Sequence, residues 1–412
     1  MRELLLLWLG ALLGGQAPDS SRVPREVELV GLQVTRPHVV VPYLTAKAGE
    51  PCPQECVQSD LDRMDRLGIF ASIESAWRGD TLVYTVNELP WILPVPNGRI
   101  SDEEGVSLGA GFKAPNLLGR AIAAELLFLA GSSLEFQASF QASRIGTLPL
   151  GWETMAGRTE RMDEGRGYQE VSHQGFARLW GPTDGAWQLL GEMRLVEVES
   201  DRDGICLSRD RMDVIPSIRA GILRDTRDRR SLTSRGWYTE WSVEKAGRPL
   251  HGPVDAWQFL SDNRMWIPVA GRFSLLASNL LEHQVGKTGG WRTFVVGGVN
   301  SARGLPGAWA VAPSEDLATL EARWTLLPVR PVRVVGQNLY GGLQAAGGVD
   351  FATVWGASPL AGEYGLFAGL DGIVPFVERV RTHLTWSPAS GAGFAFAFGL
   401  FEKTQAQRFR VR

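Results

Sequence analysis

The chain is poor in histidine and cysteine, two residue types that often build metal and catalytic sites. Its 412 residues include five histidines and three cysteines. The histidines show no His-x-x-x-His spacing, and no full Gly-x-x-x-x-Gly-Lys-Ser/Thr phosphate-binding loop is present. We therefore predict a protein that is not an enzyme and that needs no metal and no cofactor.

The chain also lacks a large excess of charge of either sign. The 42 Lys and Arg residues nearly balance the 45 Asp and Glu residues, which gives a formal net charge of −3. Proteins that bind nucleic acids are usually basic, because they must neutralise phosphates. The composition therefore argues against nucleic acid as a partner.

Long apolar runs are confined to the start of the chain. The run from Leu4 to Leu13 follows Arg2 and is too short to cross a bilayer as a helix, so we predict a signal peptide over residues 1–17. The predicted cleavage site lies near Ala17, although Pro18 fits such a site poorly. The remaining sequence contains no stretch of 18 apolar residues. The mature protein is then either soluble or crosses a membrane as a closed β-barrel.

The three cysteines are Cys52, Cys56 and Cys206. An exported protein reaches an oxidising compartment, where Cys52 and Cys56 can form a small local disulfide. Two free thiols are the alternative, and the sequence leaves both states open. Zinc is disfavoured because no histidine lies nearby.

Glycine and tryptophan are abundant, with 48 and 15 residues, and this suits a β-protein with tight turns and aromatic belts. From residue 105 onward, short segments alternate between apolar and small or polar residues: 106–112, 135–141, 188–198, 237–244 and 391–399. This alternation is typical of barrel strands that face lipid on one side and a lumen on the other. A soluble β-sandwich has the same period.

Two features favour the barrel over the sandwich: the length of this single β-region, and tryptophans near the segment ends. These are Trp180, Trp187, Trp237, Trp241, Trp257, Trp266, Trp291, Trp324, Trp355 and Trp386. We predict a mainly β chain with a transmembrane antiparallel barrel of about 16 strands over residues 105–412. The long loops are expected at 144–168 and 283–316.

The N-terminal part is predicted to form a separate α/β unit. Its expected elements are a strand at 27–32, a helix at 59–67 with Ser59 as N-cap and Gly68 as stop, and strands at 69–77 and 81–88. Pro90, Pro94 and Pro96 then predict a stiff linker over residues 91–104.

Two stretches of this unit resemble the second half of a POTRA domain. They are Arg-Leu-Gly-Ile-Phe-Ala-Ser-Ile at 66–73 and Leu-Val-Tyr-Thr-Val-Asn-Glu-Leu-Pro at 82–90. The resemblance implies that residues 27–90 form one POTRA domain in the periplasm. POTRA domains are thought to bind client chains by adding a strand at an exposed sheet edge.

The region from 105 to 400 resembles the barrel of the BamA/TamA/FhaC superfamily of outer-membrane proteins. The resemblance rests on five stretches: 109–120 with its Asn-Leu-Leu-Gly turn, 221–228 with Asp-Thr-Arg-Asp, 297–307 with Ala-Arg-Gly-Leu, 320–323 with Leu-Glu-Ala-Arg, and 347–355 around Asp350. It implies a barrel in a bacterial-type outer membrane.

The resemblance also implies a set of site residues. Arg303, with Gly304 and Leu305, matches the family's loop arginine motif, whose guanidinium folds into the lumen. Asp350 and Glu321 match its barrel-wall partners, and Asp371 is a weaker rival. The sequence departs from the family at Leu305, where an aromatic residue is usual, and at Ala302, where a β-branched residue is usual.

A lateral seam is expected between the first barrel strand, about 106–114, and the last, about 391–401. The residues assigned to this seam are Gly109, Gly111, Phe112, Phe394, Phe396 and Phe398.

By resemblance, the expected function is the assembly or insertion of outer-membrane proteins, or polypeptide translocation. The expected partners are outer-membrane lipid and unfolded exported polypeptides, with accessory periplasmic proteins as further candidates. A passive or client-specific pore without insertase activity is one alternative. An exported soluble β-protein that binds ligands is another.

Overall fold

The computed structural model describes most of the chain in two compact units, which divide after Glu88. The described residues are 22–101, 105–163, 167–183, 185–228, 232–298, 301–334, 337–356, 360–375 and 377–399. The predicted signal peptide, residues 1–17, lies outside them.

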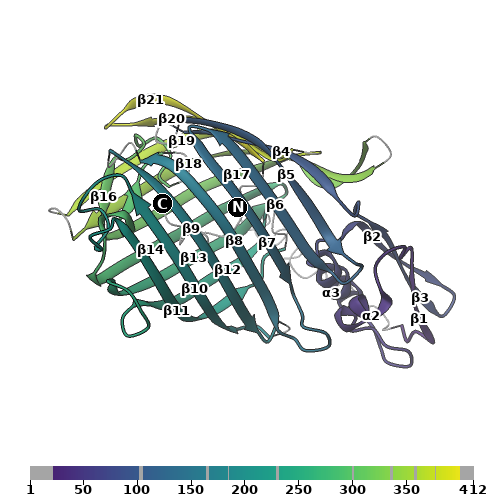
Figure 1. The fold of residues 1–412 in the computed structure, drawn as a ribbon. Coiled ribbons are helices and arrows are strands. Elements are labelled where there is room, and N and C mark those ends of the chain that lie inside the picture. Colours follow the sequence, from purple (N-terminus) through teal and green to yellow (C-terminus); the bar gives the residue numbers. More distant parts are fainter. Residues whose placement is uncertain are drawn as a thin grey trace, which may run out of the picture. The chain divides into compact units, whose positions relative to one another are not determined.

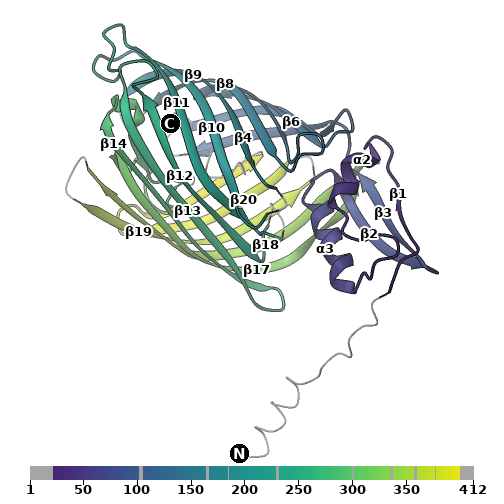
Figure 2. The same ribbon diagram turned by 90° about the horizontal axis from the view of Figure 1, so that it is seen from below.

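The first unit is a three-stranded sheet with helices on one face (Figure 2). Its elements are β1 (Glu26–Val30), α2 (Pro37–Val40), the 3-10 turn η1 (Val41–Tyr43), α3 (Gln54–Asp65), β2 (Phe70–Arg78) and β3 (Thr81–Glu88). Central β3 pairs in parallel with β1 and antiparallel with β2. The predicted strands lie within a residue or two of these. The predicted helix start was wrong, because α3 begins at Gln54 after an extended Pro53 and Ser59 lies inside the helix.

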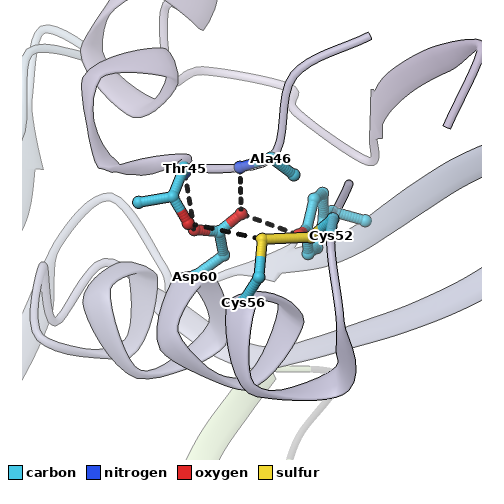
Figure 3. The surroundings of a disulfide bond; sticks show 6 residues. Thr45, Ala46, Cys52, Cys56 and Asp60 are labelled. Atoms are coloured by element: carbon cyan, nitrogen blue, oxygen red, sulfur yellow. Dashed lines mark hydrogen bonds between the residues drawn. A yellow bond between two sulfur atoms is a disulfide. The ribbon is translucent and has the colours of Figure 1, made fainter. Parts of the chain in front are cut away.

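A buried carboxylate holds this unit together. Asp60 of α3 is fully buried and accepts hydrogen bonds from Thr45 N (2.6 Å), Ala46 N (3.0 Å) and the Tyr84 hydroxyl of β3 (2.8 Å). The Thr45 hydroxyl donates a further bond (Figure 3). Burial, and then the bond to Asp60, raise the pKa of Tyr84, so its hydroxyl stays protonated and donates. One side chain therefore connects a loop, a helix and a strand.

The disulfide that the sequence left open is formed in the structure. Cys52 and Cys56 are bonded and tie the segment before α3 to its first turn (Figure 3). Cys206 is free and buried. Burial and then the charge of Asp213 raise the pKa of the Cys206 thiol to about 12, so this thiol stays protonated and unreactive at neutral pH.

Replacing Asp60 by Asn should loosen the loop at residues 44–46. The amide cannot accept all of these bonds, and a buried donor left unsatisfied costs about 1–3 kcal/mol. We expect faster amide hydrogen exchange at Thr45 and Ala46 in the full chain. Asp62→Asn is the matched control, since Asp62 lies on the same helix but makes an exposed bond to Gln58. Equal exchange in the two variants would contradict this role of Asp60.

The second unit is a sixteen-stranded antiparallel sheet among the described residues (Figure 1). Its strands follow chain order: β4 (Leu93–Ser101), β5 (Gly105–Leu117), β6 (Ile122–Gly131), β7 (Ser133–Ala142), β8 (Gly151–Asp163), β9 (Tyr168–Gly181), β10 (Gln188–Ser200), β11 (Met212–Asp225), β12 (Gly236–Gly247), β13 (Asp255–Ala270), β14 (Phe273–Lys287), β17 (Ser314–Val334), β18 (Gln337–Trp355), β19 (Ala361–Val374), β20 (Glu378–Ser387) and β21 (Gly391–Gly399). We call this the barrel sheet. Its strand number agrees with the prediction.

The barrel sheet curves round until β21 meets β4, and this contact is short. Among the described residues, two pairs join the strands, Ala397 with Arg99 and Phe398 with Gly98. The predicted linker at 91–104 was therefore largely wrong, because β4 occupies most of it. Pro94 and Pro96 are tolerated because, within the part of the chain that the structure describes, this half of β4 pairs with β5 on one side only.

The predicted long loop at 144–168 was also wrong, because it contains β8. Charged residues such as Arg158 and Glu160, which form an ion pair (2.7 Å), obscured the alternation of this strand. The loop predicted at 283–316 is real but shorter. It runs from 288 to 313 and contains the 3-10 turn η2 (Gly290–Arg292) and the hairpin β15 (Phe294–Val296) and β16 (Ala310–Ala312).

The two faces of the barrel sheet differ in chemistry. The inner face carries buried charged residues, such as Glu192 of β10 and Arg219 of β11, and loop residues reach this face. The outer face carries exposed apolar side chains, such as Leu189 and Met193. Two tryptophans predicted at the segment ends, Trp266 and Trp291, are instead buried on the inner side.

Candidate functional site

The candidate site lies on the inner face, where the loop between β14 and β17 folds against the sheet. Val296, Ala302, Leu305 and Ala312 of this loop pack with residues of the wall such as Leu317 in one apolar cluster. Leu305 is almost fully buried in this cluster, in the place where the resemblance led us to expect an aromatic residue. Burial of these side chains favours the folded-in loop.

The Arg303 guanidinium binds Asp350 of β18 through two parallel bonds. Its Nε lies 2.7 Å from Asp350 Oδ2, and its Nη2 lies 2.9 Å from Oδ1. The backbone N–H of Arg303 also donates to Oδ2 at 2.8 Å. Thr319 on neighbouring β17 donates to Oδ1 at 2.8 Å and orients the carboxylate. Such a bidentate pair restricts both distance and orientation.

Glu321 of β17 is the second partner of Arg303. Its Oε2 accepts from Arg303 Nη1 at 3.0 Å, and its Oε1 accepts from Arg323 Nε at 2.5 Å. Two guanidinium groups thus face two carboxylates, and all four side chains are buried. Buried charges are stable only when they are paired in this way.

Two further wall residues were not predicted. The ring of Phe367 on β19 lies under the Arg303 guanidinium, with 3.3 Å between Cζ and the ring centroid. Gly365, two residues earlier, lies against the loop backbone, because a Cβ there would come within 2.0 Å of the Arg303 carbonyl oxygen. A glycine within an otherwise regular strand is the sequence feature that could have indicated this close approach.

Asp371, the weaker candidate partner, pairs with a different arginine. It is buried on β19 and bonds Arg381 of β20, with 3.0 Å between Oδ1 and Arg381 Nε. The neighbouring strand therefore provides its cation, as the register Asp371–Arg381 requires.

The residues assigned to the seam are divided by the structure. Phe394, Phe396 and Phe398 lie on the last strand, β21. Gly109, Gly111 and Phe112 lie on β5, which is the second strand and pairs with β4 and β6. Their placement at the seam was wrong, because β4 precedes them. The contact instead brings the Phe398 ring against Gly98 of β4, where a Cβ would meet it at 2.4 Å.

Another part of the same loop is bound to the strands on the other side of β14, namely β11, β12 and β13. Trp291 Nε1 donates to Asp213 Oδ2 of β11 at 3.0 Å. Arg292 Nη2 donates to Glu244 Oε1 of β12 at 2.9 Å and to Gln258 Oε1 of β13 at 3.0 Å. Sequence reasoning missed both residues, because nothing in their spacing links them to these strands.

Neither a metal centre nor a serine nucleophile is found in the described parts of the chain. No group of three or more His, Cys, Asp or Glu residues could hold a metal ion there. A Gly-x-Ser-x-Gly string at 105–109 lies within β5, and its Ser107 hydroxyl is 2.8 Å from that of Ser133. A nucleophile elbow needs a strand-to-helix turn instead. Among the described residues, no helix has the length and apolarity to cross a membrane.

Comparison with known proteins is consistent with this architecture. Residues 116–307, a little under half of the chain, match the Omp85 superfamily domain. The match covers the strands from β6 to β15 and ends just after Arg303. It confirms the resemblance to BamA/TamA/FhaC-type barrels inferred from the sequence.

Solved structures of such barrels share the fold. BamA from Haemophilus ducreyi lacking POTRA domains 1–3 is 13% identical, with a TM-score of 0.58 over 92% of this chain and 84% of that chain. CdiB from Escherichia coli is 14% identical, with a TM-score of 0.61 over 92% and 76%. CdiB from Acinetobacter baumannii is 12% identical, with a TM-score of 0.59 over 92% and 73%. No curated protein matches the chain significantly.

The Arg303–Asp350 pair should show strong energetic coupling. Arg303→Ala and Asp350→Ala should each destabilise the barrel sheet by about 3–5 kcal/mol, because each leaves a buried charge unpaired. The double variant should cost much less than the sum. The measurement is urea unfolding of the full chain in lipid vesicles. Arg303→Ala combined with Glu192→Ala is the control and should be nearly additive, because Glu192 of β10 pairs with Arg178 and Arg194 instead. Additivity for Asp350 would refute the pairing.

Adding one methyl group at Gly365 should displace the loop. Gly365→Ala places Cβ against the Arg303 carbonyl, so we expect faster proteolysis within residues 288–313. Gly362→Ala, on the same strand, is the matched control, since its Cβ would meet Thr353 Oγ1 at an ordinary 3.6 Å. If the loop is cleaved at the same rate in Gly365→Ala as in the control, the close approach of Gly365 to the loop is contradicted.

Proposed function

We propose that this protein is a non-enzymatic assembly or translocation barrel of a bacterial-type outer membrane that acts on exported polypeptides. The observation that carries the proposal is an Omp85 superfamily domain whose loop arginine is paired with two carboxylates of the wall. The barrel sheet then spans the membrane with its apolar outer face in lipid. Arg303, Gly304 and Leu305 hold the loop inside it.

The first unit is proposed to be a periplasmic POTRA domain that receives clients. Its order of elements, with β1, two short helices, α3 and the β2–β3 hairpin, supports this assignment. Because β3 is central, β1 and β2 each leave one edge without a partner strand among the described residues. Such an edge can bind an extended client by backbone hydrogen bonds.

The contact between β4 and β21 is proposed to be the lateral seam. Two pairs of described residues hold it, whereas neighbouring β20 pairs with β21 along its whole length. Opening it costs few hydrogen bonds, and the freed edges can template a client strand or admit it to lipid. The driving free energy comes from folding of the client.

Closing the seam covalently should stop the activity. Gly98→Cys with Phe398→Cys places a disulfide across the directly opposed pair. We expect proteoliposomes of this oxidised variant to lose insertion of an unfolded outer-membrane client, and a reductant to restore it. Ala138→Cys with Ala156→Cys, an opposed pair of β7 and β8, is the matched control and should stay active. Full activity of the oxidised seam variant would overturn the proposal.

Removal of the first unit tests its role separately. Deletion of residues 27–88 should abolish client insertion but leave a heat-modifiable barrel on gels, because the two units are compact by themselves. Loss of the barrel as well would contradict independent modules.

A passive or client-specific pore is the alternative function. It predicts ion conductance in planar bilayers, with no effect of the chain on client assembly. The loop residues bound on the inner face oppose free passage, which favours the assembly role.

A further inference from the structure

One arginine on the outer face of the barrel sheet lacks the carboxylate partner that the inner arginines have. Arg224 alternates outward from β11, one residue before the strand ends. Its guanidinium lies between two tryptophan rings, 5.6 Å from the centroid of Trp187 and 5.5 Å from that of Trp237. Its Nε has no hydrogen-bond partner, and no carboxylate pairs with it among the residues that the structure describes. The Arg224 guanidinium can therefore bind an anionic ligand.

The strand register places a polar row beside this arginine. Arg224 is opposite Thr239 of β12, and Thr239 is opposite Asn263 of β13. Asn263 Oδ1 accepts from Trp241 Nε1 at 3.1 Å and from the Thr239 hydroxyl at 3.2 Å. The polar groups therefore cluster at the end of β11 that carries Arg224.

An apolar hollow begins next to this row, on the same face. It has a volume of about 420 Å³, which lies within the range of ligand sites. The small residues Ala220 and Ser261 form its floor. The large residues directly opposite them, Val243 and Trp241, form its sides. Trp241 connects the two regions, since it lines the hollow and contacts Trp187 with 6.1 Å between ring centroids.

We propose that Arg224 and this hollow together bind one membrane phospholipid. The guanidinium binds the phosphate, for which its planar donors are well suited, and one acyl chain lies in the hollow. This arrangement matches the orientation of a lipid in a membrane. Arg224 lies near the end of β11, at headgroup level, and Ala220 lies four residues further along the strand towards the membrane centre. Tryptophan and arginine are typical of this interfacial depth. The inference rests on the proposed membrane-spanning barrel.

The apolar hollow favours a lipid over a free phosphate. A small anion would use only the guanidinium and the polar row, and the hollow would then have no occupant. A phospholipid satisfies the cation and fills the hollow at the same time.

Native mass spectrometry of the full chain in detergent, titrated with phosphatidylglycerol, tests this site. We expect one tightly bound lipid, with Arg224→Gln weakening its binding by about tenfold or more, since a charge-assisted bidentate contact is lost. Arg272→Gln is the matched control, because this exposed arginine lies in a turn at the same end and contacts the Leu326 carbonyl. Equal binding by wild type and Arg224→Gln, or equal loss in the control, would overturn the proposal.

A second variant leaves the arginine in place. Ala220→Leu with Ser261→Leu fills the hollow and should weaken binding of phosphatidylglycerol, while glycerol phosphate should not displace the lipid from wild type. Unchanged lipid binding in the filled variant, or displacement by glycerol phosphate alone, would refute the acyl site. Heat-modifiable migration checks folding of each variant. The number of bound lipids is measured without any client, so a failure of client insertion would not change it. The lipid site and the proposed function can therefore be refuted independently.

Discussion

The pairing of Arg303 with Asp350 and Glu321 is the interaction on which the interior of the barrel sheet depends. It joins a long loop to two adjacent strands by four charge-assisted hydrogen bonds, including one from the loop backbone. An arginine brought into an enclosed space would be costly without these carboxylates. The loop position therefore follows from charge neutralisation, and apolar packing around Leu305 completes it.

In the proposed mechanism, the ion pairs stiffen the barrel wall and the weak seam is the place where it opens. The inner face is stiffened by paired charges and by loop contacts at Trp291 and Arg292, which reach β11 and β12. The contact of β4 and β21, in contrast, has two residue pairs in the described part of the chain. Local opening costs the least free energy where the fewest hydrogen bonds must break, so in this mechanism the seam opens before the rest of the wall. A barrel built in this way can admit a strand without unfolding.

Much of this architecture could be predicted from the sequence, because alternation and short motifs report local structure. The strand at 81–88 and the number of barrel strands followed from period and length, and Arg303, Asp350 and Glu321 followed from family motifs. β4 could not be recognised, since Pro94 and Pro96 resemble a linker unless one edge is known to lack a partner. Phe367, Gly365 and Asp60 act through contacts between residues far apart in sequence, which no local pattern reveals.

The most direct test is a cryo-electron microscopy structure of the full chain in lipid nanodiscs. The account predicts the Arg303 guanidinium inside the barrel, within hydrogen-bonding distance of the Asp350 carboxylate and over the Phe367 ring. A loop that extends into bulk water, with Arg303 far from any carboxylate of the wall, would contradict it.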